Sequence, residues 1–471
     1  MVSKIYIADW LYVKEYELTP NDISLIKAEL TVVPKFFPDQ QNPPEDILNF
    51  STKHDGWLGV PIEWGLRKWP NAEVVNKTSA GYTIESHVRL PDSNHPKAAP
   101  AQGKFISDLL EAALDYYTIL AQAPTGSGKT VSALSVAAQL GATTLIVAPT
   151  ETLAHQWKEE IKDKLGVDES KIGWLQQDTI DYEGKDFVVG IINSLAKRDY
   201  DKEVYKYFGT VIWDEVHITG AQMFRKTLGK FYATTKIALT ATPKRKDGCH
   251  KVFIDYFGEP SVIAQSKALK AYYKVITYSG PSYPPDLAHG TLINRLARDK
   301  ARNNLIVNTL SDLFIDGRTI LVIGDRVEHL EELINLCADA RIPRDIMGQF
   351  TREKTKLDSN RNILKLGSKK LKRVRVPKEE LDSIKESSQI IFATYGMMKQ
   401  GVDIPRLDAG IDVTPRSEGT QVIGRIRRPV PDKKTPLWVT IEDINSHKLR
   451  AITRSRIRDY KNCNTELLRN G

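Results

Sequence analysis

Residues 123–130 combine glycines, a lysine and hydroxyls in a pattern suited to binding phosphate groups. Gly126 and Gly128 let the backbone approach a phosphate, whose charge the amides at a helix start can accept. Lys129 is then expected to reach the β- and γ-phosphates, and Thr130 to hold Mg²⁺. The expected phosphate loop is completed by Ala123, Pro124, Thr125 and Ser127. This pattern predicts that the chain binds a nucleoside triphosphate.

The sequence on either side of this loop fits the same interpretation. Residues 115–121 form a short strand-like run, and residues 131–138 are helix-like. A phosphate loop of this kind joins a strand to the helix that follows it. The one departure is Ala123, which stands where the simplest form of the motif has glycine.

A pair of carboxylates further along the chain could carry the hydrolysis of that triphosphate. Asp214 lies 85 residues after Lys129 and is followed by Glu215, behind the apolar run 208–213. That run reads as a buried strand, and α/β sheets place their ligands at the carboxyl ends of strands. Asp214 is expected to orient Mg²⁺ through its water shell, and Glu215 to polarise the attacking water. The alternative is that both carboxylates simply cap a strand.

The composition is that of an ordinary globular protein. The chain has 471 residues, of which 41% are hydrophobic and 27% charged, so we expect two to four domains. No apolar run reaches the length of a membrane span, and the N-terminus lacks the pattern of a signal peptide. Cys249, Cys337 and Cys463 are too scattered for a disulfide framework or a metal set. We expect a soluble protein in a reducing cytoplasm.

Positive charge is concentrated in one segment. Residues 352–378 contain eleven basic and two acidic residues, a balance of +9, whereas the whole chain carries +8. Such concentration is typical of contacts to a phosphate backbone. The candidate contacts are Lys369, Lys370, Lys372, Arg373 and Arg375. The alternative is a solvated basic loop.

The chain is expected to divide into four parts. Residues 1–95 predict a small α+β accessory domain that could bind DNA. Residues 96–262 alternate strand and helix patterns, which predicts a parallel sheet with crossover helices. Residues 263–445 repeat this alternation without a phosphate loop. Residues 446–471 include an expected basic helix at 447–460, with Lys448, Arg450, Arg454, Arg456 and Arg458.

A second set of polar residues lies near the C-terminal end of the second α/β unit. Residues 421–428 read Gln-Val-Ile-Gly-Arg-Ile-Arg-Arg. Arginine brought to the γ-phosphate from a second lobe accelerates hydrolysis by about 10³–10⁵-fold where it has been dissected. On its own this string is a weak signal, because basic residues on an exposed helix are common.

The ordered set of motifs resembles superfamily 2 helicases over about residues 101–460. It comprises residues 123–130, 148–150, 214–217, 240–242, Thr394 with 401–405, and 421–428. The set looks most similar to the DExH-type DNA helicases, which include XPB-like proteins and phage branch-migration helicases of the UvsW type. The resemblance implies two tandem RecA-like parallel-sheet domains, flanked by the N-terminal accessory domain and the basic C-terminal helix.

The resemblance also implies roles for individual residues. Gln102 would contact adenine, while Gly401 and Asp403 would lie near the ribose and phosphates. Gln421, Arg425 and Arg428 would be catalytic, the two arginines acting from the second lobe. Thr240 and Thr242 would link the ATP state to the nucleic-acid groove. The nucleic-acid strand would be touched by Thr150, Ser194 and Thr394. For Thr240, Thr242 and Gly401 the alternatives are a strand cap and a simple turn.

The function expected from these features is that of a monomeric ATP- and Mg²⁺-dependent motor acting on forked, branched or single-stranded DNA. It would unwind or branch-migrate DNA in replication, recombination or repair. Two alternatives remain, namely an RNA helicase of the same superfamily and an ATP-gated clamp that binds nucleic acid without moving along it. The residues do not determine the polarity of translocation or the preferred nucleic-acid structure.

Overall fold

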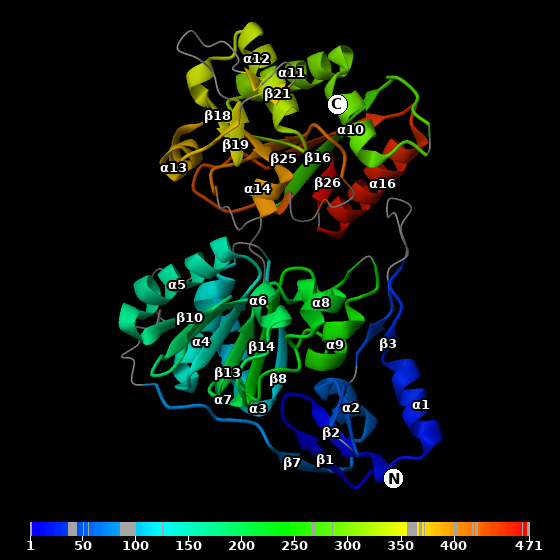
Figure 1. Ribbon diagram of the computed structural model, residues 1–471. Coiled ribbons are helices and arrows are strands. Elements are labelled where there is room, and N and C mark those ends of the chain that lie inside the picture. Colours follow the sequence, from blue (N-terminus) through cyan, green and yellow to red (C-terminus); the bar gives the residue numbers. More distant parts are fainter. Residues whose placement is uncertain are drawn as a thin grey trace. The chain divides into compact units, whose positions relative to one another are not determined.

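The computed structural model divides the chain into two compact units, Met1–Ser266 and Lys267–Gly471. It describes residues 2–35, 45–49, 51–54, 56–84, 100–124, 127–245, 247–264, 269–284, 286–355, 365–366, 370–371, 373–399, 404–416, 419, 423–463 and 465–468. Each unit is built on a sheet of parallel strands with helices (Figure 1). The α/β fold class expected from the sequence is therefore confirmed, with two RecA-like domains.

The first unit begins with a five-stranded sheet. Its strands, in spatial order, are β5 (Ser51–His54), β6 (Trp57–Val60), β2 (Leu11–Lys14), β1 (Lys4–Ile7) and β7 (Glu73–Asn76). The flanking elements are α1 (Pro20–Glu29), α2 (Ile62–Lys68) and the short pair β3 (Thr31–Val32) and β4 (Ile47–Leu48). Helix α1 begins at a capping box in which Thr19 and Asp22 bond to each other's backbone amides. Strand β1 alternates, with Ile5 and Ile7 fully buried.

This sheet shares its hydrophobic core with the parallel sheet that follows. Trp10 packs edge-on against Tyr256, with ring centroids 5.7 Å apart. The Tyr256 hydroxyl donates to the carbonyl of Asp9, and the buried Lys236 ammonium donates to the carbonyl of Ala8 at 3.0 Å. The N-terminal residues are thus packed into the first unit, which spans two of the four parts expected from the sequence. The division into four parts stays a prediction.

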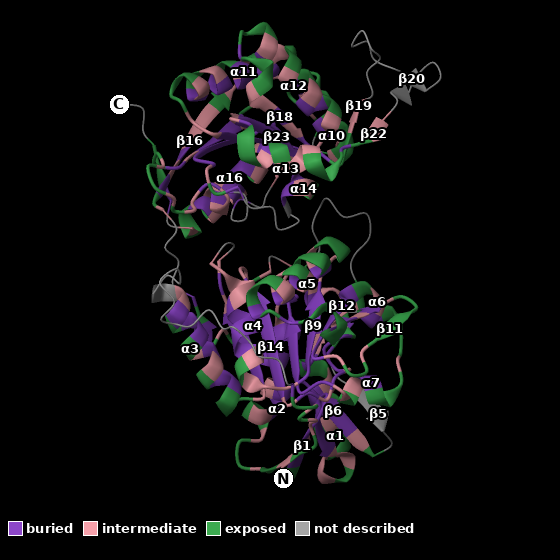
Figure 2. Cartoon of the chain, turned by 90° about the vertical axis from the view of Figure 1, so that its left-hand side faces the viewer, coloured by how far each residue is buried: buried purple, intermediate pink, exposed green. Residues whose placement is uncertain are grey.

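The parallel sheet of the first unit has eight strands. Their spatial order is β11 (Thr179–Asp181), β10 (Ile172–Gln176), β12 (Phe187–Ile191), β9 (Thr144–Ala148), β13 (Thr210–Trp213), β14 (Thr235–Thr240), β8 (Thr118–Gln122) and β15 (Val262–Ile263). All pairings are parallel except that of β10 with β11. Strands β9, β12, β13 and β14 are buried along their whole length (Figure 2). Continuous burial is expected where helices cover both faces of a parallel sheet.

The helices of this sheet connect its strands. They are α3 (Pro100–Asp115), α4 (Lys129–Leu140), α5 (Glu151–Leu165), α6 (Ile192–Lys197), α7 (Lys202–Lys206), α8 (Gln222–Arg225) and α9 (Lys251–Phe257), with 3-10 turns at Glu169–Lys171 and Val216–Gly220. Helix α5 is capped by the Thr150 hydroxyl and ends at Gly166, whose φ of +67° is in the left-handed region.

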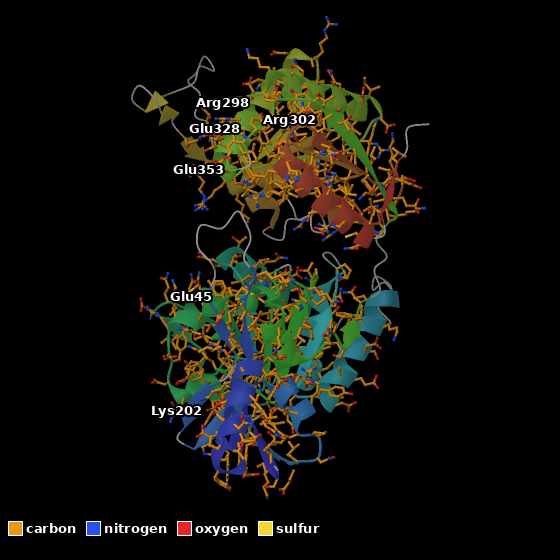
Figure 3. The ribbon with its side chains drawn as sticks, turned by 90° about the vertical axis from the view of Figure 1, so that its right-hand side faces the viewer. Glu45, Lys202, Arg298, Arg302, Glu328 and Glu353 are labelled. Atoms are coloured by element: carbon orange, nitrogen blue, oxygen red, sulfur yellow. The ribbon has the colours of Figure 1, made fainter. Side chains whose placement is uncertain are left out.

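The second unit contains a seven-stranded parallel sheet. Its spatial order is β18 (Met347–Phe350), β23 (Ile390–Thr394), β17 (Ile320–Gly324), β24 (Ala409–Asp412), β25 (Leu437–Asp443), β16 (Ala271–Tyr278) and β26 (Thr465–Leu467). Its helices are α10 (His289–Ala297), α11 (Lys300–Ile315), α12 (Val327–Asp339), α13 (Lys378–Ser387), α14 (Tyr395–Lys399) and α16 (His447–Asn462). Arg302 is buried within this unit (Figure 3), where its guanidinium pairs with Asp443 at 2.9 Å.

The described parts of the basic segment form antiparallel strand pairs. Strand β19 (Glu353–Thr355) pairs with β22 (Arg373–Arg375), and β20 (Lys365–Leu366) pairs with β21 (Lys370–Leu371). The segment between the parallel-sheet strands β18 and β23 therefore leaves that sheet and doubles back on itself before helix α13.

Two negative findings apply to the described residues. None of their helices is both long and apolar enough to cross a membrane. They also contain no group of three or more His, Cys, Asp or Glu side chains that could hold a metal ion.

Candidate nucleotide-binding site

The expected phosphate loop and the acidic pair lie at one edge of the first parallel sheet. Strands β13, β14 and β8 are neighbours and run parallel, so their carboxyl ends meet at the same edge. Asp214 and Glu215 follow β13, Thr240 ends β14, and the loop at Ala123 follows β8. The sheet topology thus brings together motifs that are far apart in the sequence.

Gly128 is the residue at which the loop turns into helix α4. It is the N-cap and has a φ of +83°, in the left-handed region that favours glycine. A Cβ atom at this position would lie 2.5 Å from Nε2 of Gln102. The Gln102 side chain, from α3, is therefore packed against the phosphate loop. Gln102 is thus next to the expected nucleotide site, while its contact with adenine stays a prediction.

The loop has polar groups suited to an anionic ligand. Among the described residues, no side chain caps the start of α4 and its first turn contains no acidic residue, so its first amides have no competing carboxylate there. The Ser127 hydroxyl is buried without a hydrogen-bond partner in the described part of the chain. Phosphate oxygens would satisfy both kinds of donor. These residues fit a bound triphosphate.

The remaining loop residues are only partly placed. Ala123 is fully buried and its amide donates to the carbonyl of Thr240 at 2.9 Å. The Pro124 carbonyl accepts from the Ser127 amide at 3.2 Å. Thr130 is the second residue of α4 and is partly exposed. Thr125 and Gly126 lie outside the described residues.

Lys129 and Glu215 form a direct ion pair. Lys129 Nζ lies 2.9 Å from Glu215 Oε1, and the lysine side chain is only 10% exposed. Glu215 has a φ of +48°, an uncommon conformation for a residue other than glycine. Burial alone would raise the pKa of Glu215, but the Lys129 ammonium and the His217 side chain outweigh it and bring that pKa down to about 2. The glutamate is thus held as a carboxylate, as a group that polarises water must be.

Asp214 is more deeply buried than Glu215. Its Oδ2 accepts a hydrogen bond from the indole nitrogen of Trp157 at 2.9 Å, and its amide donates to the carbonyl of Val147. Burial, together with the charge of Glu215, raises the pKa of Asp214 above its usual range. A divalent cation would favour the charged form of this carboxylate, which, with Thr130, is the group we expect to hold Mg²⁺.

A chain of contacts leads from Glu215 to the end of β14. Nδ1 of His217 lies 3.3 Å from Glu215 Oε2 and 3.2 Å from the Thr240 hydroxyl. That hydroxyl also accepts from the amide of Thr242 at 3.1 Å. The residues expected to link the ATP state to the nucleic-acid groove are therefore connected to the acidic pair through one imidazole.

Two participants in this network were not predicted as site residues. Trp157 lies on α5, 57 residues before the carboxylate it contacts. Arg245 donates to the carbonyl of His217 at 2.7 Å. Neither belongs to a motif, and only the sheet topology brings them to the site, so no local pattern in the sequence could have identified them.

The three hydroxyls predicted to touch nucleic acid all make local hydrogen bonds. Thr150 accepts from the Leu153 amide at 3.3 Å, Ser194 from the Gln177 amide at 3.1 Å, and Thr394 from the Met397 amide at 3.4 Å. All three are partly exposed. A hydroxyl that accepts one bond can still donate its proton, so these contacts are compatible with the predicted role.

In the second unit, the arginines of residues 421–428 differ in their surroundings. Arg425 donates to the carbonyl of Met398 at 2.7 Å. Arg427 donates to the carbonyls of Leu269 and Cys463, which ties it to the fold. Arg428 is half-buried, and burial lowers the pKa of its guanidinium. Gln421, Gly401 and Asp403 lie outside the described residues, so their predicted roles are not tested.

The candidate contacts of the basic segment are also not alike. Arg373 is already paired with Glu331, with Nη1 and Oε1 3.2 Å apart, and with Glu328. Arg375 is exposed. Lys370 belongs to β21, while Lys369 and Lys372 lie outside the described residues. The positive charge of this segment is therefore partly neutralised at Arg373.

Comparison with known proteins agrees with the motifs. Residues 96–245 match the family model described as the type III restriction enzyme, res subunit. A protein of Acanthamoeba polyphaga mimivirus is 26% identical over 454 residues, covering 92% of this chain and 80% of its own length. A protein of African swine fever virus is 27% identical over 369 residues, covering 72% and 67%. Both carry the name "Putative ATP-dependent RNA helicase".

A solved structure has a similar fold. S. cerevisiae Dbp5, bound to RNA and ADP BeF3, matches with a TM-score of 0.50 and 11% identity, covering 80% of this chain and 95% of its own. The matched family model and the viral relatives support the coarser conclusion that the motifs gave, that of a superfamily 2 helicase. Helicases of this class use ATP, usually with Mg²⁺.

Proposed function

We propose that this protein is an ATP-driven DNA translocase that unwinds or branch-migrates forked and junction DNA in replication, recombination or repair. The observation that carries the proposal is the connected series Lys129, Glu215, His217 and Thr240 at one sheet edge. A site built only for binding would not need a carboxylate held charged beside the phosphate loop and linked to a second strand end.

The residues of the first unit have separable tasks in this proposal. Lys129 and the first amides of α4 hold the phosphates, and Gln102 closes the loop from the side. Thr130 and Asp214 hold Mg²⁺, which neutralises charge on the phosphates when bound. Glu215 orients and polarises the attacking water, for which Lys129 must move from the carboxylate to a phosphate.

Coupling to nucleic acid follows from the His217 contacts. When Lys129 leaves Glu215, the carboxylate keeps its contact with His217, which also touches Thr240. A change in the charge balance at Glu215 therefore reaches the β14 end and the Thr242 amide. Arg425 and Arg428 of the second unit supply positive charge to the γ-phosphate in this proposal. Alternating grips of the two units on the strand, set by the ATP state, then step the protein along it.

DNA as the substrate rests on the sequence resemblance. The segment 214–217 ends in His217 rather than aspartate, which sets the chain apart from the DEAD-box pattern. The specific rival is an RNA helicase, favoured by the names of the two viral relatives. An ATP-gated clamp without processive motion is the second rival. The proposal also includes a monomeric motor in the cytoplasm, that of the host if a phage encodes it.

ATP hydrolysis and strand displacement, measured side by side on four substrates, test the proposal. The substrates are a DNA fork, a Holliday junction, a linear DNA duplex and an RNA duplex of matched sequence. We expect multiple-turnover hydrolysis stimulated by DNA, and strand displacement fastest on the fork or junction. Displacement of the RNA duplex alone would establish the RNA helicase instead. Stimulated hydrolysis without displacement of any substrate would establish the clamp.

A further inference from the structure

One face of helix α16 presents a row of cations that the fold does not use. Arg450, Arg454, Arg458 and Lys461 recur at intervals of three or four residues, which places them on one side of a helix. Arg454, Arg458 and Lys461 are exposed and make no hydrogen bond or ion pair with any residue that the structure describes. Arg450 has only a distant carboxylate, with its Nε 4.0 Å from Oε1 of Glu442.

The side chains of this face leave an open depression between them. Its volume is about 550 Å³, and it is lined by these four cations together with His447, Ala451 and Ile457. Among the described residues, no carboxylate lines it. The one acidic side chain in the same stretch of helix, Asp459, accepts from the Gly419 amide at 3.1 Å. The depression therefore has a single sign of charge, carried on apolar stems that can pack against a ligand.

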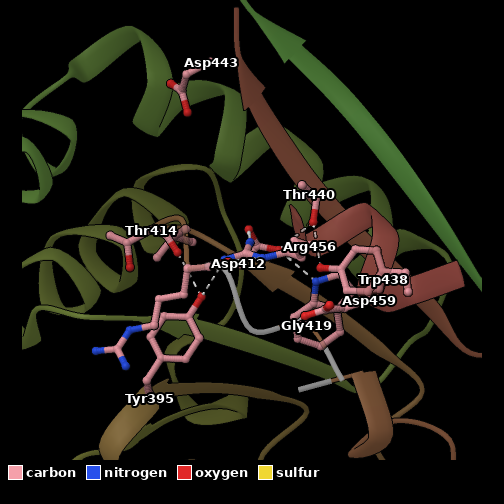
Figure 4. Close-up of polar contacts among 12 residues, drawn as sticks. Tyr395, Asp412, Thr414, Gly419, Trp438, Thr440, Asp443, Arg456 and Asp459 are labelled. Carbon is pink, nitrogen blue, oxygen red and sulfur yellow. Dashed lines mark hydrogen bonds and ion pairs between the residues drawn. The ribbon is translucent and has the colours of Figure 1, made fainter. Parts of the chain in front are cut away.

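The opposite face of α16 is fixed firmly to the sheet (Figure 4). Arg456, one of the basic residues of this helix, is buried and pairs with Asp412. It also donates to the carbonyl of Arg416 at 2.7 Å. The Tyr460 hydroxyl lies 3.0 Å from that of Thr440, which donates to Asp412 at 2.7 Å. The row of cations is thus held on a rigid support, so binding a ligand there would not require the helix to be ordered first.

We infer that this face, formed by Arg450, Arg454, Arg458 and Lys461, binds the phosphodiester backbone of a nucleic-acid strand. The row spans about 16 Å along the helix axis. A strand carries one charge per roughly 3.4 Å, so four or five phosphates fit along it. Arginine offers planar donors that match phosphate oxygens. The inference rests on the proposed function and adds to it a strand contact in the second unit outside the helicase motifs.

The test compares the full-length protein with the double variant Arg454→Ala/Arg458→Ala. Binding of single-stranded DNA and of single-stranded RNA of the same sequence is measured by fluorescence anisotropy over a range of salt concentrations. If both arginines contact phosphates, the slope of log K against log salt should become flatter by roughly 1.4. At low salt we expect affinity to fall by about tenfold. ATP hydrolysis without nucleic acid should be unchanged.

Two further variants separate a phosphate contact from other effects. Arg454→Lys/Arg458→Lys keeps the charges and should restore most of the affinity and the salt slope. Lys158→Ala/Lys162→Ala removes the same charge at the same spacing from α5, where both lysines already pair with Glu169. This control should leave the salt slope unchanged. Circular dichroism and thermal melting show whether the variants are folded.

The possible results lead to distinct conclusions. Equal loss on DNA and RNA, restored by lysine, supports a contact to the shared backbone. An unchanged slope in the folded alanine variant would overturn the inference, as would a loss confined to one polymer or an equal loss in the α5 control. Strand displacement by the wild-type protein is measured in parallel. Its absence would overturn the proposed function, whereas the inference fails only on the binding result.

Discussion

The two parallel sheets differ in the polar groups that surround the helix starts at their strand ends. In the first unit, α4 starts at Gly128 with no acidic residue in its first turn, and the Ser127 hydroxyl has no partner among the described residues. In the second, α12 carries Glu328 in its first turn, an acidic group where the helix would otherwise attract an anion. The edge of the first sheet can thus accept a phosphate. At the second sheet, the negative charge at the helix start comes from the chain itself, as the carboxylate of Glu328.

The same difference appears in the carboxylates. Glu215 has the lysine of the phosphate loop as its cation, a partner that a triphosphate would draw away. In the second unit, Asp325 accepts from Thr414 and Arg416, and Asp412 accepts from Trp438, Thr440 and Arg456. Those carboxylates stabilise loops, and the donors that they bind belong to the fold. Two sheets of the same architecture can therefore differ in role. In the first, the cation that pairs with the carboxylate can exchange it for a ligand, whereas in the second the carboxylates are bound by donors that belong to the fold.

The largest expected effect is on Lys129. Lys129→Ala removes the cation of the phosphate loop and leaves Glu215 without its partner, so ATP turnover should fall by about 10³-fold or more. A coupled-enzyme assay in the presence of DNA measures this. Lys104→Ala is the matched control, because Lys104 is an exposed lysine of α3 that pairs with Asp108. Substantial ATP turnover in Lys129→Ala would mean that the Lys129–Glu215 pair does not distinguish the first sheet from the second as the site of hydrolysis.

The arginines of the second unit should have the next largest effect. Arg425→Ala and Arg428→Ala should each lower kcat by about 10²-fold with little change in nucleotide binding, since their charge is needed only in the transition state. Arg427→Ala should instead lower Tm, because Arg427 bonds two carbonyls of the fold. Normal DNA-stimulated hydrolysis in both of the first two variants would show that the second unit supplies no arginine to the reaction.

The basic segment should affect binding without affecting basal hydrolysis. With Lys369, Lys370, Lys372, Arg373 and Arg375 all replaced by alanine, affinity should fall on every sequence. The salt slope should flatten by roughly 0.7–0.9 for each phosphate that the variant no longer neutralises. Because Arg373 already pairs with Glu328 and Glu331, Arg375→Ala should change the slope more than Arg373→Ala. An unchanged salt slope in the five-site variant would mean that this segment is a solvated basic loop that does not contact phosphates.

The smallest effect concerns stability and pH in the second unit. Burial, and then the charge of Arg302, lower the pKa of His329 to about 3. Between pH 3 and about 6.5 the unfolded chain therefore binds one more proton than the folded one, and the free energy of unfolding decreases as the pH falls. His329→Gln should reduce this slope by up to about 1.4 kcal/mol per pH unit. Urea unfolding at several pH values measures it, and equal slopes would contradict the buried neutral imidazole.

The sequence predicted the regular elements of both units closely, because strand and helix patterns are local. The apolar run 208–213, read as a buried strand, contains β13, Thr210–Trp213, and the basic helix expected at 447–460 is α16, His447–Asn462. Long-range packing could not be predicted. Counting charges gave Arg456 as one of five basic residues of this helix, but it could not show that this side chain is buried and pairs with Asp412.

The candidate site was predictable to the extent that it consists of motifs. The loop at Gly128 and the acidic pair could be found from spacing alone. The contact of Trp157 with Asp214, and the packing of Gln102 against Gly128, depend on how strands are ordered in the sheet. The sharing of one core by the N-terminal residues and the first parallel sheet likewise depends on contacts such as that of Trp10 with Tyr256.

The central claim is that Glu215 polarises the water that attacks ATP, and single-turnover hydrolysis by Glu215→Gln tests it most directly. Excess protein is mixed with radiolabelled ATP, Mg²⁺ and DNA, and both bound ATP and released phosphate are followed over time. We predict that the variant binds ATP as tightly as the wild-type protein and holds it unhydrolysed, because the amide keeps the shape of the side chain and loses its basicity. Phosphate release at the wild-type rate would contradict the account.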